Sequence, residues 1–201
     1  MAISVDQIKA LREQTGVGIL DVRKALEDAN GDYDLALENL RAKGLATAAK
    51  RADREASEGI VELYSHGDGR VGVMVEVNCE TDFVARSEEF RNFAHEIALQ
   101  IAASAPEFIR VEEIPEGTIN LKQKLAYEQA LEDGKPDNVA EKIAEGRLKK
   151  YIQEVVLLEQ EYIRDEDLSI EQLLLQTVAA LGENVIVRRF ARWELGESSA
   201  S

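Results

Sequence analysis

The fold class is decided by three consecutive segments, Ile60-Val61-Glu62-Leu63-Tyr64, Ser65-His66-Gly67-Asp68-Gly69-Arg70 and Val71-Gly72-Val73-Met74-Val75-Glu76-Val77. The outer two segments are rich in β-branched residues, and valine occupies every second position of the last one, which is typical of a strand with one buried face. The middle segment is rich in Gly and Asp, the residues that tight turns favour. We therefore predict a β-hairpin over residues 60–77.

The sequence before this hairpin has apolar residues at helical spacing instead. Ser4 and Gln7 stand three residues apart, as in a capping box, and predict the start of a first helix. The two glycines within residues 15–18 should end this helix, and the apolar residues that follow predict a second helix over residues 19–29. Asp32 is a suitable N-cap for a third helix.

We expect the third helix to end at Gly44, because glycine commonly follows the last helical residue. Residues 45–57 are rich in alanine and in charge and contain neither glycine nor proline, which predicts a helical connector. The sequence therefore indicates a small three-helix domain over residues 1–54 and a second domain over residues 55–201.

Helical and extended segments alternate after the hairpin. The spacing of apolar residues predicts helices over residues 90–101, over most of 121–162 with a break at 133–136, and over 169–182. Residues 184–195 have the pattern of one more strand. This order of elements predicts an α+β fold in which an antiparallel sheet packs against helices.

The composition is that of an acidic globular protein. Of the 201 residues, 45% are hydrophobic, and 39 acidic residues against 24 basic ones give a formal net charge of −15. Such a charge disfavours direct binding to nucleic acid, whose phosphates would repel the chain. The sequence has no apolar stretch long enough to span a membrane, and a single cysteine excludes an internal disulfide. The first residues lack the basic and apolar runs of a secretory signal, so we expect none. We expect a cytoplasmic protein.

The sequence offers little that could carry catalysis. Cys79, His66 and His95 could supply a nucleophile and a base, but His66 falls in the predicted turn, His95 in an amphipathic helix and Cys79 at a strand end. A nucleophile, a base and an orienting group must converge, and nothing in the pattern indicates that these residues do. The sequence also lacks a calcium-binding loop and a phosphate-binding loop, so we expect no enzyme, no cofactor and no metal.

The segment Val77-Asn78-Cys79-Glu80-Thr81-Asp82-Phe83-Val84-Ala85-Arg86 is the strongest candidate site. It lies where the buried strand ends and a helix begins, a place where side chains can project from a rigid frame. Two interpretations of Phe83 are open. Apolar residues near helix starts usually belong to the core, which favours a ring tucked under the following helix, but the ring could instead be offered to a partner.

A second candidate is the turn at residues 15–20. Val17, Ile19 and Leu20 surround two glycines and could form an exposed apolar patch on the helical domain. They could equally be core residues of that domain, which is the commoner outcome.

These two segments resemble motifs of the elongation factor Ts family. The first motif is Leu11-Arg12-Glu13-Gln14-Thr15-Gly16-Val17-Gly18-Ile19-Leu20-Asp21-Val22-Arg23-Lys24-Ala25-Leu26, and the second is Glu76-Val77-Asn78-Cys79-Glu80-Thr81-Asp82-Phe83-Val84-Ala85-Arg86. A third likeness is Asn184-Val185-Ile186-Val187-Arg188-Arg189-Phe190. The three motifs occur in this order along nearly the whole length of the chain, and the second is highly specific. Arg23 departs from the lysine usual in the family but keeps the charge, and the length is similar to that of the short members.

The resemblance implies an N-terminal domain of the ubiquitin-associated type, an α+β core and a role in nucleotide exchange on GDP-bound elongation factor Tu. In the family, the Thr-Asp-Phe-Val segment enters the partner beside its magnesium and phosphate site, while the N-terminal domain docks on the nucleotide domain. Carried over, Phe83 would be the wedge, and Thr81, Asp82 and Val84 would help to displace the magnesium ion. The residues that would supply docking are Arg12, Val17, Gly18, Ile19 and Leu20.

The resemblance also implies a homodimer, as in other short members. An alternative remains open in which the chain is a passive adaptor or dimerisation module that binds a protein without accelerating nucleotide release. An enzyme that uses Cys79 is a further alternative.

Overall fold

The computed structural model describes residues 3–15 and 17–197. The described chain forms two compact units, one built from the residues up to Ala98 together with those from Glu171 onward, and one from Leu99–Ile170. Gly16, which belongs to the predicted turn, and residues 198–201 lie outside the described residues. The expected division of the chain after residue 54 stays a prediction.

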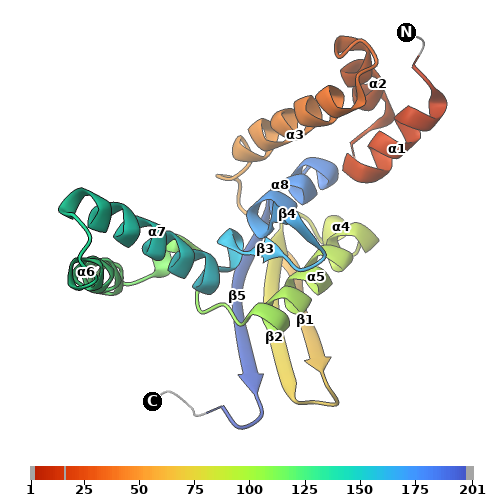
Figure 1. The fold of residues 1–201 in the computed structure, drawn as a ribbon. Coiled ribbons are helices and arrows are strands. Elements are labelled where there is room, and N and C mark those ends of the chain that lie inside the picture. The colour runs from red at the N-terminus through yellow and green to blue at the C-terminus, as the bar shows by residue number, and fades with distance from the viewer. Residues whose placement is uncertain (1–2, 16, 198–201) are drawn as a thin grey trace. The chain divides into compact units, whose positions relative to one another are not determined.

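The first unit begins with three helices, α1 (Val5–Thr15), α2 (Ile19–Asp28) and α3 (Tyr33–Ala49), which Figure 1 shows in red and orange. The predicted capping box is present, since the Ser4 N–H donates to the Gln7 side chain and the Gln7 N–H donates to the Ser4 hydroxyl, both at 3.1 Å. Asp32 caps α3 by accepting from the Leu35 N–H at 3.1 Å. The three starts predicted from the sequence are therefore confirmed.

Apolar residues from all three helices form the core of this bundle. The buried members are Leu11, Val22, Ala25, Leu26, Ala29, Ala36 and Leu40. Val17, from the turn between α1 and α2, is partly buried and packs against them.

The prediction that the third helix ends at Gly44 is wrong. α3 continues through Gly44 to Ala49, and the predicted helical connector is helical only up to that point. A Cβ atom at residue 44 would lie 3.4 Å from the Cβ of Ala179 on helix α8 (Ile170–Leu181). That distance is an ordinary van der Waals contact, so Gly44 lies inside α3 where the helix passes α8, and a glycine within a helix does not by itself mark the helix end.

A three-stranded antiparallel sheet forms the other part of the first unit. Its order is β1 (Glu58–His66), β2 (Val71–Cys79), β5 (Val185–Glu194), so the predicted hairpin and the predicted closing strand are neighbours. His66 pairs with Val71 across the turn, and Cys79 pairs with Val185 at the other end. A bulge after Glu76 places Arg188 outside the regular pairing, and its side chain donates to Asn78 at 2.8 Å and to the Ala56 carbonyl at 2.9 Å.

The two faces of the sheet differ. Val73, Val75 and Val77 of β2 are buried, and helix α5 (Glu88–Ser104) is joined to the sheet by a contact of 3.0 Å between His95 and Glu62. The opposite face leaves apolar side chains exposed. They are Val61, Leu63, Met74 and Trp193.

The second unit is dominated by a helical hairpin of α6 (Glu116–Glu132) and α7 (Asp137–Val155), shown in green in Figure 1. Ile114, Val155 and Val156 form a small core beside it. The prediction that helix extends to about Tyr162 is wrong at its end. The chain after α7 instead forms the short helix η2 (Leu157–Glu159) and a two-stranded sheet of β3 (Glu161–Tyr162) and β4 (Asp165–Ser169).

Buried side-chain amides hold the end of this unit together. The side-chain amide nitrogen of Gln100 donates to Gln160 and to the Glu161 carbonyl, each at 3.1 Å, and its oxygen accepts from the Ile163 N–H at 3.0 Å. The remaining short element, η1 (Val111–Glu113), precedes α6. The α+β class, with a helical N-terminal region followed by a sheet and helices, is confirmed.

Candidate functional site

The segment after β2 turns the chain sharply into a helix of one turn, α4 (Asp82–Ala85). Thr81 is its N-cap, and its hydroxyl oxygen accepts from the Val84 N–H at 3.3 Å. Ser87 secures the other end, since its hydroxyl donates to the Val84 carbonyl at 2.8 Å and accepts from the Phe90 N–H at 3.3 Å. We call residues 79–86 the corner. Both ends of its helix are fixed by hydrogen bonds.

Phe83 is the exposed apolar residue of this corner. Its relative exposure is 81%, whereas Val84 is 8% and Ala85 5% exposed. A single helical turn can bury only one side, and Val84 and Ala85 occupy the buried side. The interpretation in which Phe83 tucks under the following helix is therefore wrong, and Val84 and Ala85 are the buried apolar residues of α4. A Phe ring left in water forgoes roughly 1.5–3 kcal/mol of burial free energy.

The charged and polar members of the corner also face solvent. Thr81 and Asp82 are exposed, and the Asp82 carboxylate forms an ion pair of 2.9 Å with Arg86 one turn later. An ion pair on a surface this open contributes at most about 1 kcal/mol. Asp82 therefore remains free to exchange Arg86 for another positive partner at small cost.

Glu183 lies under the corner and accepts three hydrogen bonds from it. One carboxylate oxygen, Oε2, accepts from the N–H groups of Glu80 and Thr81 at 3.1 and 3.0 Å, and the other, Oε1, accepts from the Thr81 hydroxyl at 2.6 Å. Glu183 stands just before β5 and is separated from the corner by about a hundred residues of sequence. Sequence reasoning missed it, because no local pattern indicates a contact of this range.

A second contact joins the same two segments, from Glu80 in the corner to Asn184 beside Glu183. The Glu80 carboxylate accepts from the Asn184 N–H at 2.7 Å and lies 3.5 Å from Arg54. The buried Asn184 side chain donates to the carbonyls of Ala52 and Arg54 at 3.2 and 2.7 Å. The corner, the chain before β5 and the segment that follows α3 are thus joined by one set of hydrogen bonds.

A groove of about 580 Å³ brings the corner together with α1. Phe83, Val84 and Ser87 line it from the corner side, and Lys9 and Arg12 line it from α1. The proposed wedge and one predicted docking residue thus border the same hollow. Its other lining residues are Glu89, Ala180 and Leu181.

The remaining predicted docking residues lie at the start of α2. Ile19 and Leu20 are exposed large apolar side chains, Gly18 is exposed, and Val17 is partly buried against the bundle core. Ile19 and Leu20 therefore fit the interpretation as an exposed patch, whereas Val17 fits the interpretation as part of the core. None of these four residues lines the groove that holds Phe83.

Cys79 does not have the properties of a nucleophile. It is buried, and this burial, together with the charge of Glu183, raises the pKa of its thiol from 9.0 to about 11. The thiol donates to the Thr81 carbonyl at 3.2 Å. His66 hydrogen-bonds with Tyr64 at 2.9 Å, and His95 with Glu62 at 3.0 Å. Neither histidine is therefore engaged as a base for Cys79.

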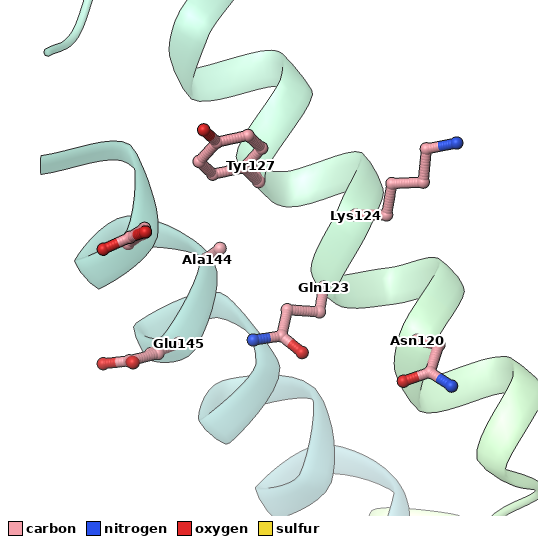
Figure 2. A pocket seen from close by; sticks show the side chains of 7 residues that line it. Asn120, Gln123, Lys124, Tyr127, Ala144 and Glu145 are labelled. Atoms are coloured by element: carbon pink, nitrogen blue, oxygen red, sulfur yellow. The ribbon is translucent and has the colours of Figure 1, made fainter. Parts of the chain in front are cut away.

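A second hollow, of about 530 Å³, lies between α6 and α7 and differs in character. Figure 2 shows Gln123 and Tyr127 on the side of α6 that faces α7, while Lys124 extends away from it. The Tyr127 hydroxyl donates to the Asp137 carboxylate, which raises the pKa of the tyrosine. The residues that line this hollow are mostly polar, and they do not bring reactive groups together at one point.

Two further searches concern only the part of the chain that the structure describes. Within it, no group of three or more His, Cys, Asp or Glu residues is arranged to hold a metal ion. The helices of residues 3–15 and 17–197 include none long and apolar enough to cross a membrane.

Comparison with known proteins shows extensive similarity. The family model described as "Elongation factor TS" matches residues 36–197. A protein named elongation factor Ts from Carboxydothermus hydrogenoformans is 53% identical over 198 residues, which cover 98% of this chain and 91% of that protein. Proteins of the same name from Caldanaerobacter subterraneus and Herpetosiphon aurantiacus are 54% and 48% identical and cover 97% and 98% of the chain, with 98% and 100% of their own lengths matched.

Proposed function

The chain belongs to the elongation factor Ts family and is a translation elongation factor, and on this premise we propose that it is the guanine nucleotide exchange factor of elongation factor Tu. In this proposal the chain binds the GDP-bound partner and accelerates GDP release. No covalent bond is made or broken, so the chain acts by binding and not as an enzyme in the usual sense. Its place of action would be the cytoplasm.

The observation that carries the proposal is the exposure of Phe83 on a helix held at both ends. Burial of this ring in the partner would contribute roughly 1.5–3 kcal/mol. Each 1.4 kcal/mol corresponds to about a tenfold change in affinity, so insertion of one ring could weaken GDP binding by about one to two orders of magnitude. Because such coupling is reciprocal, GDP must weaken binding of the factor by the same amount.

Thr81 and Asp82 would act beside the ring. Both are exposed next to Phe83. The negative charge of the Asp82 carboxylate would disturb the partner's magnesium ion and the groups that coordinate it. Val84 is buried, so its contribution would be to anchor α4 while Phe83 projects. Removal of magnesium coordination would add to the effect of the ring.

Docking would fall to the N-terminal bundle. Leu20 and Ile19 present apolar surface at the start of α2, next to the exposed Gly18, and Val17 supports the turn from the bundle core. Arg12 lies at the groove beside Phe83 and could pair with an acidic group of the partner. In this arrangement, the bundle supplies affinity and the corner supplies the effect on GDP.

Release of fluorescently labelled GDP from elongation factor Tu tests the proposal. The full chain should accelerate release strongly and saturably. The alternative, a passive adaptor, predicts that the chain binds the partner while the rate of GDP release stays at its spontaneous value. That result would contradict nucleotide exchange as the function.

We further propose that the chain forms a homodimer through the outer face of its sheet. Leu63 and Trp193 on this face are 69% and 81% exposed, and Met74 lies between their strands. A shallow hollow of about 330 Å³ among these residues is almost entirely apolar in its lining. Large exposed apolar patches mark interaction sites, and a second copy of the same face would cover this one symmetrically.

A further inference from the structure

We propose that Glu183 is a positioning residue for nucleotide exchange, which holds the corner so that Phe83 projects in one direction. This inference rests on the proposed exchange function. Glu183 itself lies in the segment between α8 and β5, and its bonds go to Glu80 and Thr81 rather than to Phe83. It therefore acts on the wedge through other residues.

The link from Glu183 to Phe83 passes through the Thr81 hydroxyl. This hydroxyl donates to Glu183 at 2.6 Å and at the same time accepts from the Val84 N–H at 3.3 Å. Because a hydroxyl has one proton, the bond to Glu183 fixes the direction of that proton and leaves a lone pair for the helix. Glu183 thus sets the rotamer of the residue that caps α4.

The need for such a clamp follows from the length of α4. Four residues provide a single turn, and isolated helices of this size are not stable by themselves. The exposed Phe83 ring is not buried in the chain, so it adds little packing that would stabilise the helix. Hydrogen bonds to a charged acceptor are the strong kind, and three of them converge on this one carboxylate.

The backbone next to Glu183 is itself held by hydrogen bonds. The adjacent Asn184 is buried, donates its backbone N–H to Glu80, and is fixed by two carbonyls of the segment after α3. A loss of Glu183 therefore leaves the Asn184 contacts in place. We expect the corner to loosen locally while the sheet remains folded.

The test compares Glu183→Ala and Glu183→Gln with Glu132→Gln, a control that removes one negative charge from an exposed residue of α6. Gln can keep the pattern, because its oxygen can accept from the two N–H groups and its amide can donate to the Thr81 oxygen. Ala removes all three bonds. Comparable thermal unfolding of the variants would establish that each is folded, and if Glu183→Ala fails to fold, Glu183→Asp, which keeps the charge on a side chain one methylene shorter, takes its place with the same expected direction of change.

Two measurements are made on these variants. In the free chain, amide hydrogen exchange at Glu80 and Thr81 should be about tenfold faster or more in Glu183→Ala than in the parent. In GDP release from elongation factor Tu, the maximal rate at saturating factor should fall about tenfold, with less than a threefold change in the half-saturating concentration. Glu183→Gln should fall between Glu183→Ala and the parent in both measurements, because it keeps the bonding positions but loses the charge of the acceptor, and the control should match the parent.

The outcomes separate the two proposals. If the parent chain does not accelerate GDP release, the proposed function fails, and hydrogen exchange still decides whether Glu183 holds the corner. If the parent accelerates release and Glu183→Ala does so equally well, the positioning role is overturned. It is also overturned if Glu183→Ala raises only the half-saturating concentration, which would indicate a docking contact, or if Glu183→Gln loses as much as Glu183→Ala.

Discussion

At the scale of the residue, two neighbours in the corner have opposite environments. Phe83 is exposed and Val84 is buried, although both are apolar and both follow a capping threonine. Local statistics place apolar residues at helix starts in the core, and this holds for Val84. Which of the two turns inward depends on the direction of a one-turn helix, and that direction depends on Glu183 far along the sequence. The corner could be found from the sequence, but the orientation of its ring could not.

Cys79 provides a prediction at the same scale. Because its pKa is raised to about 11, we expect alkylation by iodoacetamide at pH 7.5 to be far slower in the folded chain than in the chain unfolded by urea. Alkylation of the unfolded chain is the control for reagent activity. Rapid modification of the folded chain, with loss of GDP release activity, would favour the alternative of a reactive cysteine.

The same shift predicts a pH dependence of stability. Below about pH 9 the thiol is protonated in both states, and between 9 and 11 only the unfolded state loses its proton. Cys79 therefore favours the unfolded state increasingly as the pH rises through this window. In urea unfolding, the parent should lose more stability between pH 8.5 and 10.5 than Cys79→Ala does, and equal losses would contradict the shift.

At the scale of the element, periodic patterns were sufficient for most helices and strands. The hairpin, α1, α2, α5 and β5 follow directly from their spacing of apolar residues. The pattern failed at the end of α3 and after α7. Gly44 lies inside α3 and does not end the helix, and the β3–β4 pair is too short for a periodic pattern.

The hairpin contains one position where only glycine fits. Gly59 has a φ of +144°, and a Cβ there would lie 2.1 Å from the Val77 carbonyl oxygen on the paired strand. We predict that Gly59→Ala destabilises the chain by roughly 1–3 kcal/mol or more, because the backbone strain and the clash add. Urea unfolding followed by circular dichroism measures the loss.

Gly72 is the matched control in the neighbouring strand. A Cβ at Gly72 would meet no atom within 4 Å. Gly72→Ala should therefore leave the free energy of unfolding within about 0.5 kcal/mol of the parent. Similar losses for the two variants would show that the close approach at Gly59 does not limit stability.

At the scale of the whole molecule, the sequence did not show what covers the outer face of the sheet. The alternation of β2 correctly indicates one buried face, but the exposed face is also apolar at Leu63, Met74 and Trp193. A strand that is apolar on both sides indicates a second contact without specifying what makes it. The homodimer was expected only from the family resemblance.

A charge on this face should separate the copies. Leu63→Glu and Met74→Glu place carboxylates where two sheets would meet, and burial of unpaired charge is strongly unfavourable. We expect light scattering to show dimers for the parent and monomers for the double variant. Leu125→Glu, which makes the same kind of substitution at an exposed residue of α6, is the control. Dimers that survive the double variant would place the interface elsewhere.

The central claim is that an exposed ring on a fixed corner drives nucleotide release, and the maximal rate of GDP release by Phe83→Ala tests it most directly. The account predicts that this rate falls at least tenfold. The stability of the free chain should change little, because the ring is 81% exposed there, and the N-terminal bundle should still dock on the partner. Leu125→Ala, which removes apolar surface from α6, should match the parent. A Phe83→Ala variant that releases GDP as fast as the parent would contradict the account.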